Sequence, residues 1–223
     1  MQLVIAATQF EMDAFYAVDS DFHSSEVEHL VAGVGPVESG VCATQFLAAH
    51  HMKIDSVVNF GIGGAYCSVR REPLGLLDIC VADTEILGDF GICYGYKTSP
   101  FDGDEFPVRS RFEIDERLLK RAQEALRGHH IIFHTGTFVT VNGSSGSKKR
   151  GDFLSDTYGA ICENMEGAAL ARACAAFAIP FVEIRAISNL VEDRPGPAWK
   201  TAKACDRAAR AAALIVRTFQ DSL

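Results

Sequence analysis

Short, almost continuous apolar runs alternate along the sequence with segments whose apolar residues recur at helical spacing. Residues 3–7, 55–60 and 181–188 are runs of the first kind and predict buried strands. Residues 115–127 are of the second kind and predict a helix. Alternation of such strands and helices predicts an α/β fold, with a mostly parallel sheet and helices on both of its faces.

The remaining elements follow from the same two patterns. Pro36 is well placed to begin a helix, and the spacing of Val37, Val41, Ala48 and Met52 predicts a helix over 37–52 with these residues on one apolar face. Residues 8–15 fit a loop or the start of a helix. Other strands are expected at 27–32, 77–86, 131–141 and 160–162, other helices at 166–178 and 198–219, and loops at 61–64, 87–107 and 142–151.

Length and charge limit the classes of protein that remain. Folding of a chain of 223 residues hides roughly 70% of its unfolded surface, enough for one sizeable core. We therefore expect residues 1–223 to form a single domain. The net charge of -8 disfavours nucleic acid as a partner, because an acidic chain repels the phosphate backbone.

Seven cysteines raise the question of a disulfide or metal site. A CxxC pair is the usual mark of a zinc or redox site. The number of cysteines here is odd, and no two of them form such a pair. Residues 1–7 lack the basic segment of a signal peptide, and no apolar stretch is long enough to cross a membrane. We expect reduced thiols in a cytoplasmic protein that has no membrane contact and no metal site.

Ligands of such sheets collect beyond the carboxyl ends of the strands, so the segments there are the places to look for chemistry. Glu11 follows the first strand and suits either a general base or an acid that complements the positive end of a helix. The glycines of residues 61–64 suit either close approach of the backbone to a ligand or a tight turn. They form neither a GxGxxG nor a P-loop pattern, so nucleotide phosphate binding is not supported.

Two later strand ends also carry polar groups. Met165 has a thioether that can pack on an apolar ring, and Glu166 can accept two hydrogen bonds from a diol such as the ribose hydroxyls. A charge that complements a helix dipole would explain Glu166 equally well. Asn189 offers both a donor and an acceptor, or simply forms a turn.

Other polar clusters carry weaker signals. The histidine pairs at 50–51 and 129–130 have no acidic neighbours at metal-ligand spacing, and the basic residues 148–150 fit a solvated loop. No serine lies in a GxSxG pattern, which leaves a hydrolase of the nucleophile-elbow type unsupported.

The order of these segments resembles the purine nucleosidase and phosphorylase superfamily. After the strand-proximal glutamate come N-x-G-x-x-G at 59–64, V-N-G at 141–143, M-E-G-A-A at 165–169 and I-S-N at 187–189. The stretch EIRAISNLVEDR at 183–194, followed by Trp199, is similar to the futalosine hydrolase family within it. The related methylthioadenosine and S-adenosylhomocysteine nucleosidases carry Asp where this chain has Asn189.

This resemblance implies a three-layer sandwich with a central mixed, partly curled sheet flanked by helices, assembled as a homodimer or larger oligomer and free of cofactors. It implies that Glu11 activates water and that Asn189 faces N7 of the purine. The implied substrate-binding residues are Ile62 and Gly63 beside the nucleoside, Thr140 and Val141 along the base, and Asn164, Met165 and Glu166 around the ribose.

Asn189 bears on which base leaves. An amide cannot give N7 a proton, which an adenine-type leaving group needs, but it can hydrogen-bond to N7 or O6 of a 6-oxopurine. Asn189 therefore favours hypoxanthine, the base of futalosine, over adenine. The N7 proton would then come from water or from a nearby acid such as Asp193.

Three rival functions are weighed on the same residues. A purine nucleoside phosphorylase needs arginines around phosphate, and residues 8–11 and 59–65 contain none. Asn189 disfavours a methylthioadenosine/S-adenosylhomocysteine nucleosidase, and the pair Glu11 and Glu166 disfavours a nucleoside-binding protein without activity.

Recognition of the carboxyphenyl tail of futalosine is left open by the sequence. Phe90, Tyr94, Phe101 and Phe106 lie in a loop that either stacks on the tail or is ordinarily packed. An acidic chain gives no long-range attraction for a carboxylate substrate, so a local cation is needed. The candidates are Lys97, Arg109 and Arg194.

Overall fold

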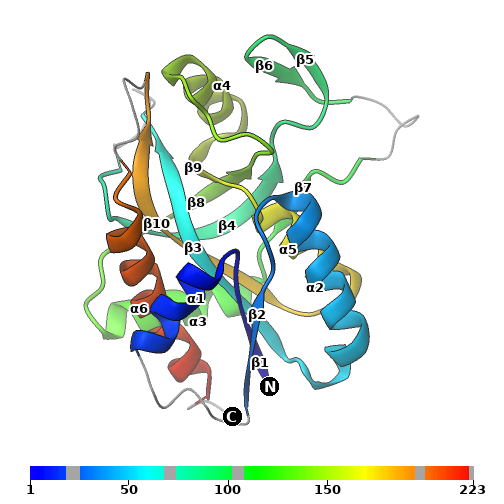
Figure 1. The fold of residues 1–223 in the computed structure, drawn as a ribbon, viewed down its shortest axis with the longest axis vertical. Helices are drawn as coiled ribbons and strands as arrows, with labels where there is room; N and C mark the ends of the chain where they lie inside the picture. The colour runs from blue at the N-terminus through cyan, green and yellow to red at the C-terminus, as the bar shows by residue number, and fades with distance from the viewer. Residues whose placement is uncertain (19–25, 68–73, 102–107, 194–198, 221–223) are drawn as a thin grey trace.

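The computed structural model describes residues 1–18, 26–67, 74–101, 108–193 and 199–220, and its main feature is one mixed β-sheet that curls back on itself (Figure 1). The strands of this sheet are β1 (Gln2–Ala6), β2 (Val27–Val31), β3 (Ser56–Tyr66), β4 (Ile79–Leu87), β7 (Arg111–Glu113), β8 (Phe133–Thr140), β9 (Ala160–Asn164) and β10 (Phe181–Val191). A small hairpin, β5 (Ile92–Tyr94) and β6 (Lys97–Ser99), stands apart from it.

The strand order explains the curl. Along the sheet the order is β10-β4-β8-β9-β3-β1-β2, and β10 also pairs with β3, so that β3, β10, β4, β8 and β9 close into a ring. Most pairings are parallel, but β10–β4, β3–β9 and β4–β7 are antiparallel. The mixed, partly curled sheet is confirmed, and the sheet is mostly parallel as expected, with three antiparallel pairings.

Helices cover both faces of the sheet (Figure 1). On one side α1 (Gln9–Val18) and α3 (Glu116–Gly128) pack against the long helix α6 (Thr201–Gln220). On the other side α2 (Pro36–His50) packs against α5 (Gly167–Ala176), and α4 (Lys148–Tyr158) lies beyond β9. A single 3-10 turn, His51–Lys53, follows α2. None of the helices in the described ranges is long and apolar enough to cross a membrane.

The expected break at residues 61–64 is wrong, because β3 continues through all three glycines to Tyr66. Here the glycines allow neighbouring side chains to lie close to the backbone of the strand, and they do not form a turn. A Cβ at Gly61 would lie 2.7 Å from both Glu11 Oε1 and Arg185 Nη1, so any side chain would displace those two groups. The sequence pattern of a turn and that of a crowded strand are the same at this point.

The expected apolar face of the 37–52 helix is also wrong. Val37 and Met52 are 74% and 87% exposed, whereas Ser39, Ala43 and Leu47 are buried. The reason is close packing of α2 on α5, for which small residues are suited: a Cβ at Gly40 would lie 3.5 Å from the Cβ of Ala169. The valines are left on the surface.

Some elements lie where a loop was expected. Helix α4 lies partly in the expected loop at 142–151, and its sequence has little apolar periodicity. Its start is fixed by polar groups instead: Ser147 Oγ accepts a hydrogen bond from the backbone N–H of Arg150, and Asp193 accepts one from that of Lys148. Strands β5 and β6 lie in the expected loop at 87–107, and β7 lies where no element was expected. Each has three residues, too few to establish an alternating pattern.

Candidate active site

A cavity of about 300 Å³ opens where the ends of β1, β3, β9 and β10 meet α1 and α6. It brings together segments from the whole length of the chain. The described residues that line it are Ala7, Thr8, Phe10, Glu11, Val34, Ile62, Gly63, Gly64, Val141, Ser144, Glu163, Asn164, Met165, Glu166, Arg185, Ser188, Asn189, Trp199, Thr201 and Cys205. All the predicted site residues except Thr140 are among them.

Glu11 is held rigidly at one end of the cavity. It lies in the first turn of α1, its Oε2 accepts hydrogen bonds from Thr8 N (3.1 Å) and Thr8 Oγ1 (2.9 Å), and its Oε1 accepts one from Ile62 N (3.2 Å). Only 5% of the residue is exposed. Three donors therefore fix a carboxylate against the wall of the cavity.

Arg185 lies near that carboxylate and pairs with two others. Its Nη1 lies 3.3 Å from Glu166 Oε2 and its Nε donates to Glu183 Oε1 at 2.7 Å. The other oxygen of Glu166 accepts a hydrogen bond from Gly35 N. Burial lowers the pKa of Arg185, but the charges of Glu183, Glu166 and Glu11 outweigh this and raise the pKa above its ordinary value. The guanidinium thus stays charged among three carboxylates, and its Nη2 has no hydrogen-bond partner within the described ranges.

Glu183 has a second buried acid, Glu85, as its neighbour. Glu85 and Glu183 are both fully buried and lie against Gly167. Burial raises the pKa of Glu85 well above 4.5, and the charge of Glu183 and a hydrogen bond to it raise that pKa further. Burial also raises the pKa of Glu183, against the opposing effect of Arg185. Glu85 therefore keeps its proton, and the negative charge of the pair resides on Glu183 beside Arg185.

The side chains of Asn164 and Thr140 connect Glu85 to the cavity floor. Asn164 Nδ2 donates to Glu85, and Asn164 Oδ1 accepts hydrogen bonds from the backbone N–H groups of Glu166 and Gly167. Thr140 Oγ1 lies 2.8 Å from Glu85 Oε2 and accepts a hydrogen bond from Ala168 N. Both side chains fix the start of α5, which is why Thr140 lies beneath the cavity instead of lining it.

At the opposite end of the cavity, Asn189 is oriented by its neighbour. Ser188 Oγ donates to Asn189 Oδ1 at 2.9 Å, which turns the amide nitrogen away from the serine. Among the described residues this nitrogen reaches the carbonyl oxygen of Leu190 at a long 3.5 Å. Glu163, which the sequence analysis did not single out, lines the same end.

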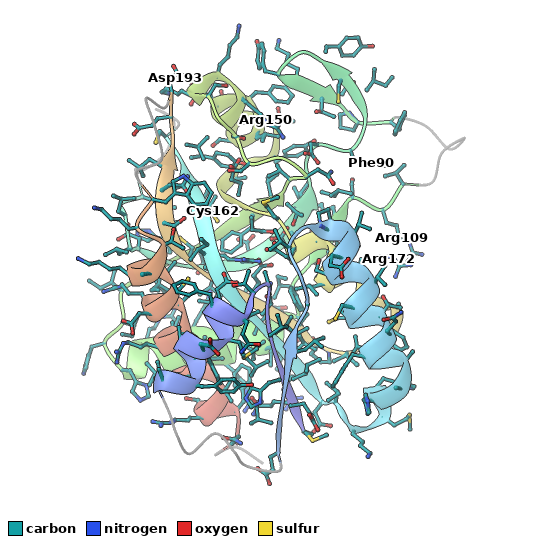
Figure 2. The ribbon with its side chains drawn as sticks, viewed as in Figure 1. Phe90, Arg109, Arg150, Cys162, Arg172 and Asp193 are labelled. Atoms are coloured by element: carbon teal, nitrogen blue, oxygen red, sulfur yellow. The ribbon has the colours of Figure 1, made fainter. Side chains whose placement is uncertain are left out.

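Several other expected residues do not line the cavity. Asp193 is exposed and caps α4, and Figure 2 shows it at the end of β10, with Phe90 and Arg109 at the opposite side of the view. Phe90 and Phe101 pack edge to face with their ring centres 5.6 Å apart. Lys97 lies over the ring of Tyr96, 5.6 Å from its centre. Phe106 and Arg194 lie outside the described residues.

The cysteines are free thiols, of which four are buried, two are half-buried and one, Cys93, is exposed. Cys205 is an addition to the expected site because it lines the cavity. Burial raises its pKa to about 12, and the charge of Glu11 contributes to this rise. It is therefore a neutral thiol on the cavity wall. Within the described ranges no three His, Cys, Asp or Glu side chains are grouped to hold a metal ion.

Arg185 and Glu163 are the residues that sequence reasoning missed. Arg185 lies inside the otherwise apolar stretch IRAI, and Glu163 directly follows the apolar stretch AIC. A charge inside a predicted buried strand was the available signal, because such a charge must be paired or face a cavity.

Comparisons with known proteins agree with this fold. The sequence profile of the phosphorylase superfamily matches residues 15–221. The structure of methylthioadenosine/S-adenosylhomocysteine nucleosidase from Helicobacter pylori superposes with a TM-score of 0.81 and 19% identity, over 100% of this chain and 98% of that one. Futalosine hydrolase of H. pylori superposes with a TM-score of 0.78 and 19% identity, over 100% and 97%. The nucleosidase from Neisseria meningitidis gives 0.80 and 19%, over 97% and 98%.

Proposed function

Because this chain belongs to the phosphorylase superfamily, we propose that it is a nucleosidase that hydrolyses the N-glycosidic bond of futalosine and releases hypoxanthine. The whole chain would act as one nucleosidase domain, in the cytoplasm, in the futalosine route to menaquinone. The observation that carries the proposal is a cavity with two carboxylates, Glu11 and Glu166, around Arg185 at one end and an amide, Asn189, at the other.

The acidic end suits activation of water. Glu11 is held by three donors and can accept a proton from a water molecule placed against its Oε1. Arg185 Nη1 and Glu11 Oε1 approach the same point beside Gly61, so the guanidinium can help to hold that water for attack on C1′. Hydroxide character then develops on a water already held beside the sugar.

Glu166 suits the ribose. Each of its oxygens has one donor and room for another, so the two sugar hydroxyls can bind there. Its negative charge favours the cationic character that the sugar gains as the bond to the base breaks. Met165 can pack on the ring of the nucleoside, as expected from the sequence.

The other end suits the leaving base. The amide nitrogen of Asn189 can donate hydrogen bonds to N7 and O6 of a 6-oxopurine. The wall of the cavity beside the base would be formed by Val141, Ile62 and Gly63. An amide cannot protonate an adenine-type base, so this residue favours hypoxanthine. The H. pylori futalosine hydrolase and the H. pylori methylthioadenosine nucleosidase are each 19% identical to this chain, so the choice between the two substrates rests on Asn189.

Water is favoured over phosphate as the acceptor. Arg185 is the basic side chain among the described residues lining the cavity, and three carboxylates already neutralise it. A phosphate dianion would meet Glu11 and Glu166 without a free cation to offset their repulsion.

The test is an assay of purified protein on futalosine, with hypoxanthine release as the readout, in the presence and absence of phosphate. We expect equal rates in both and a free sugar product. Inosine-type turnover that requires phosphate and gives a sugar phosphate would establish a phosphorylase instead. Faster release of adenine from methylthioadenosine would establish the second nucleosidase activity.

We also propose that the chain works as a homodimer or larger oligomer. Val34, Val37 and Val41 form an exposed apolar stripe, 52% to 74% exposed, that continues from the mouth of the cavity along α2. A second copy is the partner proposed for this stripe. Light scattering should give more than one chain per particle for the wild type and one chain for Val37→Asp/Val41→Asp. A monomeric wild type would contradict the proposal.

A further inference from the structure

Glu183 is a buried acid that the proposed reaction does not use. It is fully buried and is absent from the cavity lining among the described residues. It lies on β10, which runs between β3 and β4 (Figure 1), two residues before Arg185. Residues two apart on a strand point to the same face of the sheet, so the acid and the guanidinium lie side by side. A buried carboxylate is costly unless it is paired, and Arg185 is the cation that pairs with it.

The contact with Glu183 fixes one edge of the Arg185 guanidinium. Arg185 Nε donates to Glu183 Oε1 at 2.7 Å. On the other edge, Nη1 donates to the carbonyl oxygen of Ile62 at 3.3 Å and lies 3.3 Å from Glu166 Oε2. Because the guanidinium is planar and its donors form a rigid fork, contacts at Nε and Nη1 together set both its plane and its direction.

The direction of Nη1 matters because this atom lies between the two carboxylates of the cavity. A Cβ at Gly61 would lie 2.7 Å from Arg185 Nη1 and 2.7 Å from Glu11 Oε1, and Glu166 Oε2 lies on the other side of Nη1. Arginine prefers a two-point pair with a carboxylate. A guanidinium free to turn would form such a pair with Glu11 or Glu166 and cover the oxygens that water or the sugar needs. Glu183 opposes that turn by holding Nε.

The neighbouring acid Glu85 keeps Glu183 available for this contact. A Cβ at Gly167 would collide with Glu85 Oε1 and Glu183 Oε2 together, so these two oxygens face each other. Burial raises the pKa of Glu85 well above 4.5, and a hydrogen bond to Glu183 raises it further. Burial raises the pKa of Glu183 as well, but the charge of Arg185 and the hydrogen bond from Glu85 oppose that rise. Glu85 therefore donates its proton to Oε2 of Glu183, whose Oε1 remains for Arg185 Nε.

We infer that Glu183 is a positioning residue for the hydrolysis, which holds the Arg185 guanidinium by its Nε so that Nη1 stays between the two cavity carboxylates without covering either. Glu183 does not touch the substrate and acts through Arg185. This inference rests on the proposed function, in which Glu11 holds the water and Glu166 holds the sugar.

The contact itself is tested without substrate, by proton–nitrogen NMR of the Arg185 Nε–H group. A hydrogen bond to a carboxylate should give the wild type a downfield Nε–H signal that Arg185→Lys lacks. In Glu183→Gln this signal should move upfield, because an amide oxygen is a weaker acceptor than a carboxylate. Glu85→Gln, which still offers Glu183 a donor, should keep the signal, as should the exposed control Glu116→Gln. An unchanged signal in Glu183→Gln would overturn the inference.

The effect on the reaction is tested with Glu183→Gln, Arg185→Lys and the double variant. In Glu183→Gln, kcat should fall at least about tenfold while KM changes less than about threefold, as expected for a lost hydrogen bond to a charged group that does not contact substrate. Arg185→Lys keeps the charge but lacks Nε–H and the fork, so its kcat should also fall at least about tenfold. The double variant should match Arg185→Lys within about threefold, because Glu183 acts through the guanidinium.

A purely structural role for Glu183 predicts a different result. The two losses in kcat would then multiply in the double variant, and this outcome would overturn the inference. Wild-type kcat in Arg185→Lys would overturn it as well, so a misfolded Glu183→Gln cannot obscure the result. The comparison uses whichever of futalosine and methylthioadenosine the wild type hydrolyses. Failure on futalosine alone would therefore refute the proposed function and leave this inference standing.

Discussion

The two ends of the cavity differ in how far the protein itself satisfies their polar groups. At the acidic end, Glu11 has three donors and Glu166 is held by Gly35 and Arg185. At the base end, the amide nitrogen of Asn189 has a single long contact among the described residues, with the carbonyl oxygen of Leu190. The acidic end is assembled before substrate arrives, whereas the base end is completed by the ligand. Substitutions at the first should therefore act on kcat, and those at the second on affinity and base preference.

The largest effect is expected from Glu11→Gln. The amide keeps the size of the side chain but cannot take a proton, so kcat should fall at least about 100-fold while KM changes little. Steady-state hypoxanthine release measures both. The matched control is Glu116→Gln, an exposed glutamate in the first turn of α3, which should behave as wild type. Wild-type turnover by Glu11→Gln would remove the general base from the mechanism.

An intermediate effect is expected from Asn189→Asp. A carboxylic acid at this position can donate a proton to N7, so the ratio of kcat/KM for adenosine-type over inosine-type nucleosides should rise about tenfold, a difference of about 1.4 kcal/mol in transition-state binding. Asn189→Ala, which removes the amide without adding an acid, should lower both activities without that change in ratio. An unchanged ratio in Asn189→Asp would show that Asn189 does not determine which base is preferred.

The smallest effect on turnover is expected from Glu85→Gln. This substitution tests the buried acid that is hydrogen-bonded to Asn164 and Thr140 beneath the cavity. In the folded protein the pKa of Glu85 lies well above 4.5, so the folded state keeps a proton that the unfolded chain releases. This contribution to the free energy of unfolding is complete below about pH 4.5 and declines as pH rises toward the folded pKa, by up to about 1.4 kcal/mol per pH unit.

Glutamine cannot titrate, so the decline should be absent in Glu85→Gln. Urea unfolding at pH 5, 6.5 and 8 should show the variant gaining stability relative to wild type as pH increases, with kcat within several-fold of wild type. Glu116→Gln again serves as the control. A constant difference across this range would mean that Glu85 is ionised in the folded protein.

Much of this molecule could be predicted from local pattern. The apolar run at 181–188 forms a strand, and the helical spacing of apolar residues at 115–127 forms a helix, as predicted. Asp115 caps that helix by accepting a hydrogen bond from Leu118 N. The position of the polar groups after the strands was also predictable, because eight of the nine expected site residues line one cavity.

The rest depended on partners distant in sequence. The burial of Ser39 instead of Val37 follows from how closely α5 approaches α2, and nothing within residues 36–50 specifies that distance. Thr140 was expected on the base wall, but the direction of its side chain is set by Glu85 and the start of α5. The pairing of Arg185 with Glu166 likewise joins the middle of β10 to the segment after β9, which only the closed sheet brings together.

The closed ring of β3, β10, β4, β8 and β9 also has a consequence for how fast the interior can exchange protons with solvent. None of these five strands is a free edge, so the ring cannot fray strand by strand. Glu85 and Glu183 are fully buried beside this ring, so water reaches them only when the surrounding structure opens, which is a rare event compared with local fluctuation. On the time scale of a single turnover, the proton between these acids behaves as a fixed part of the framework, and the backbone amides around it should be among the last in the chain to exchange with deuterium.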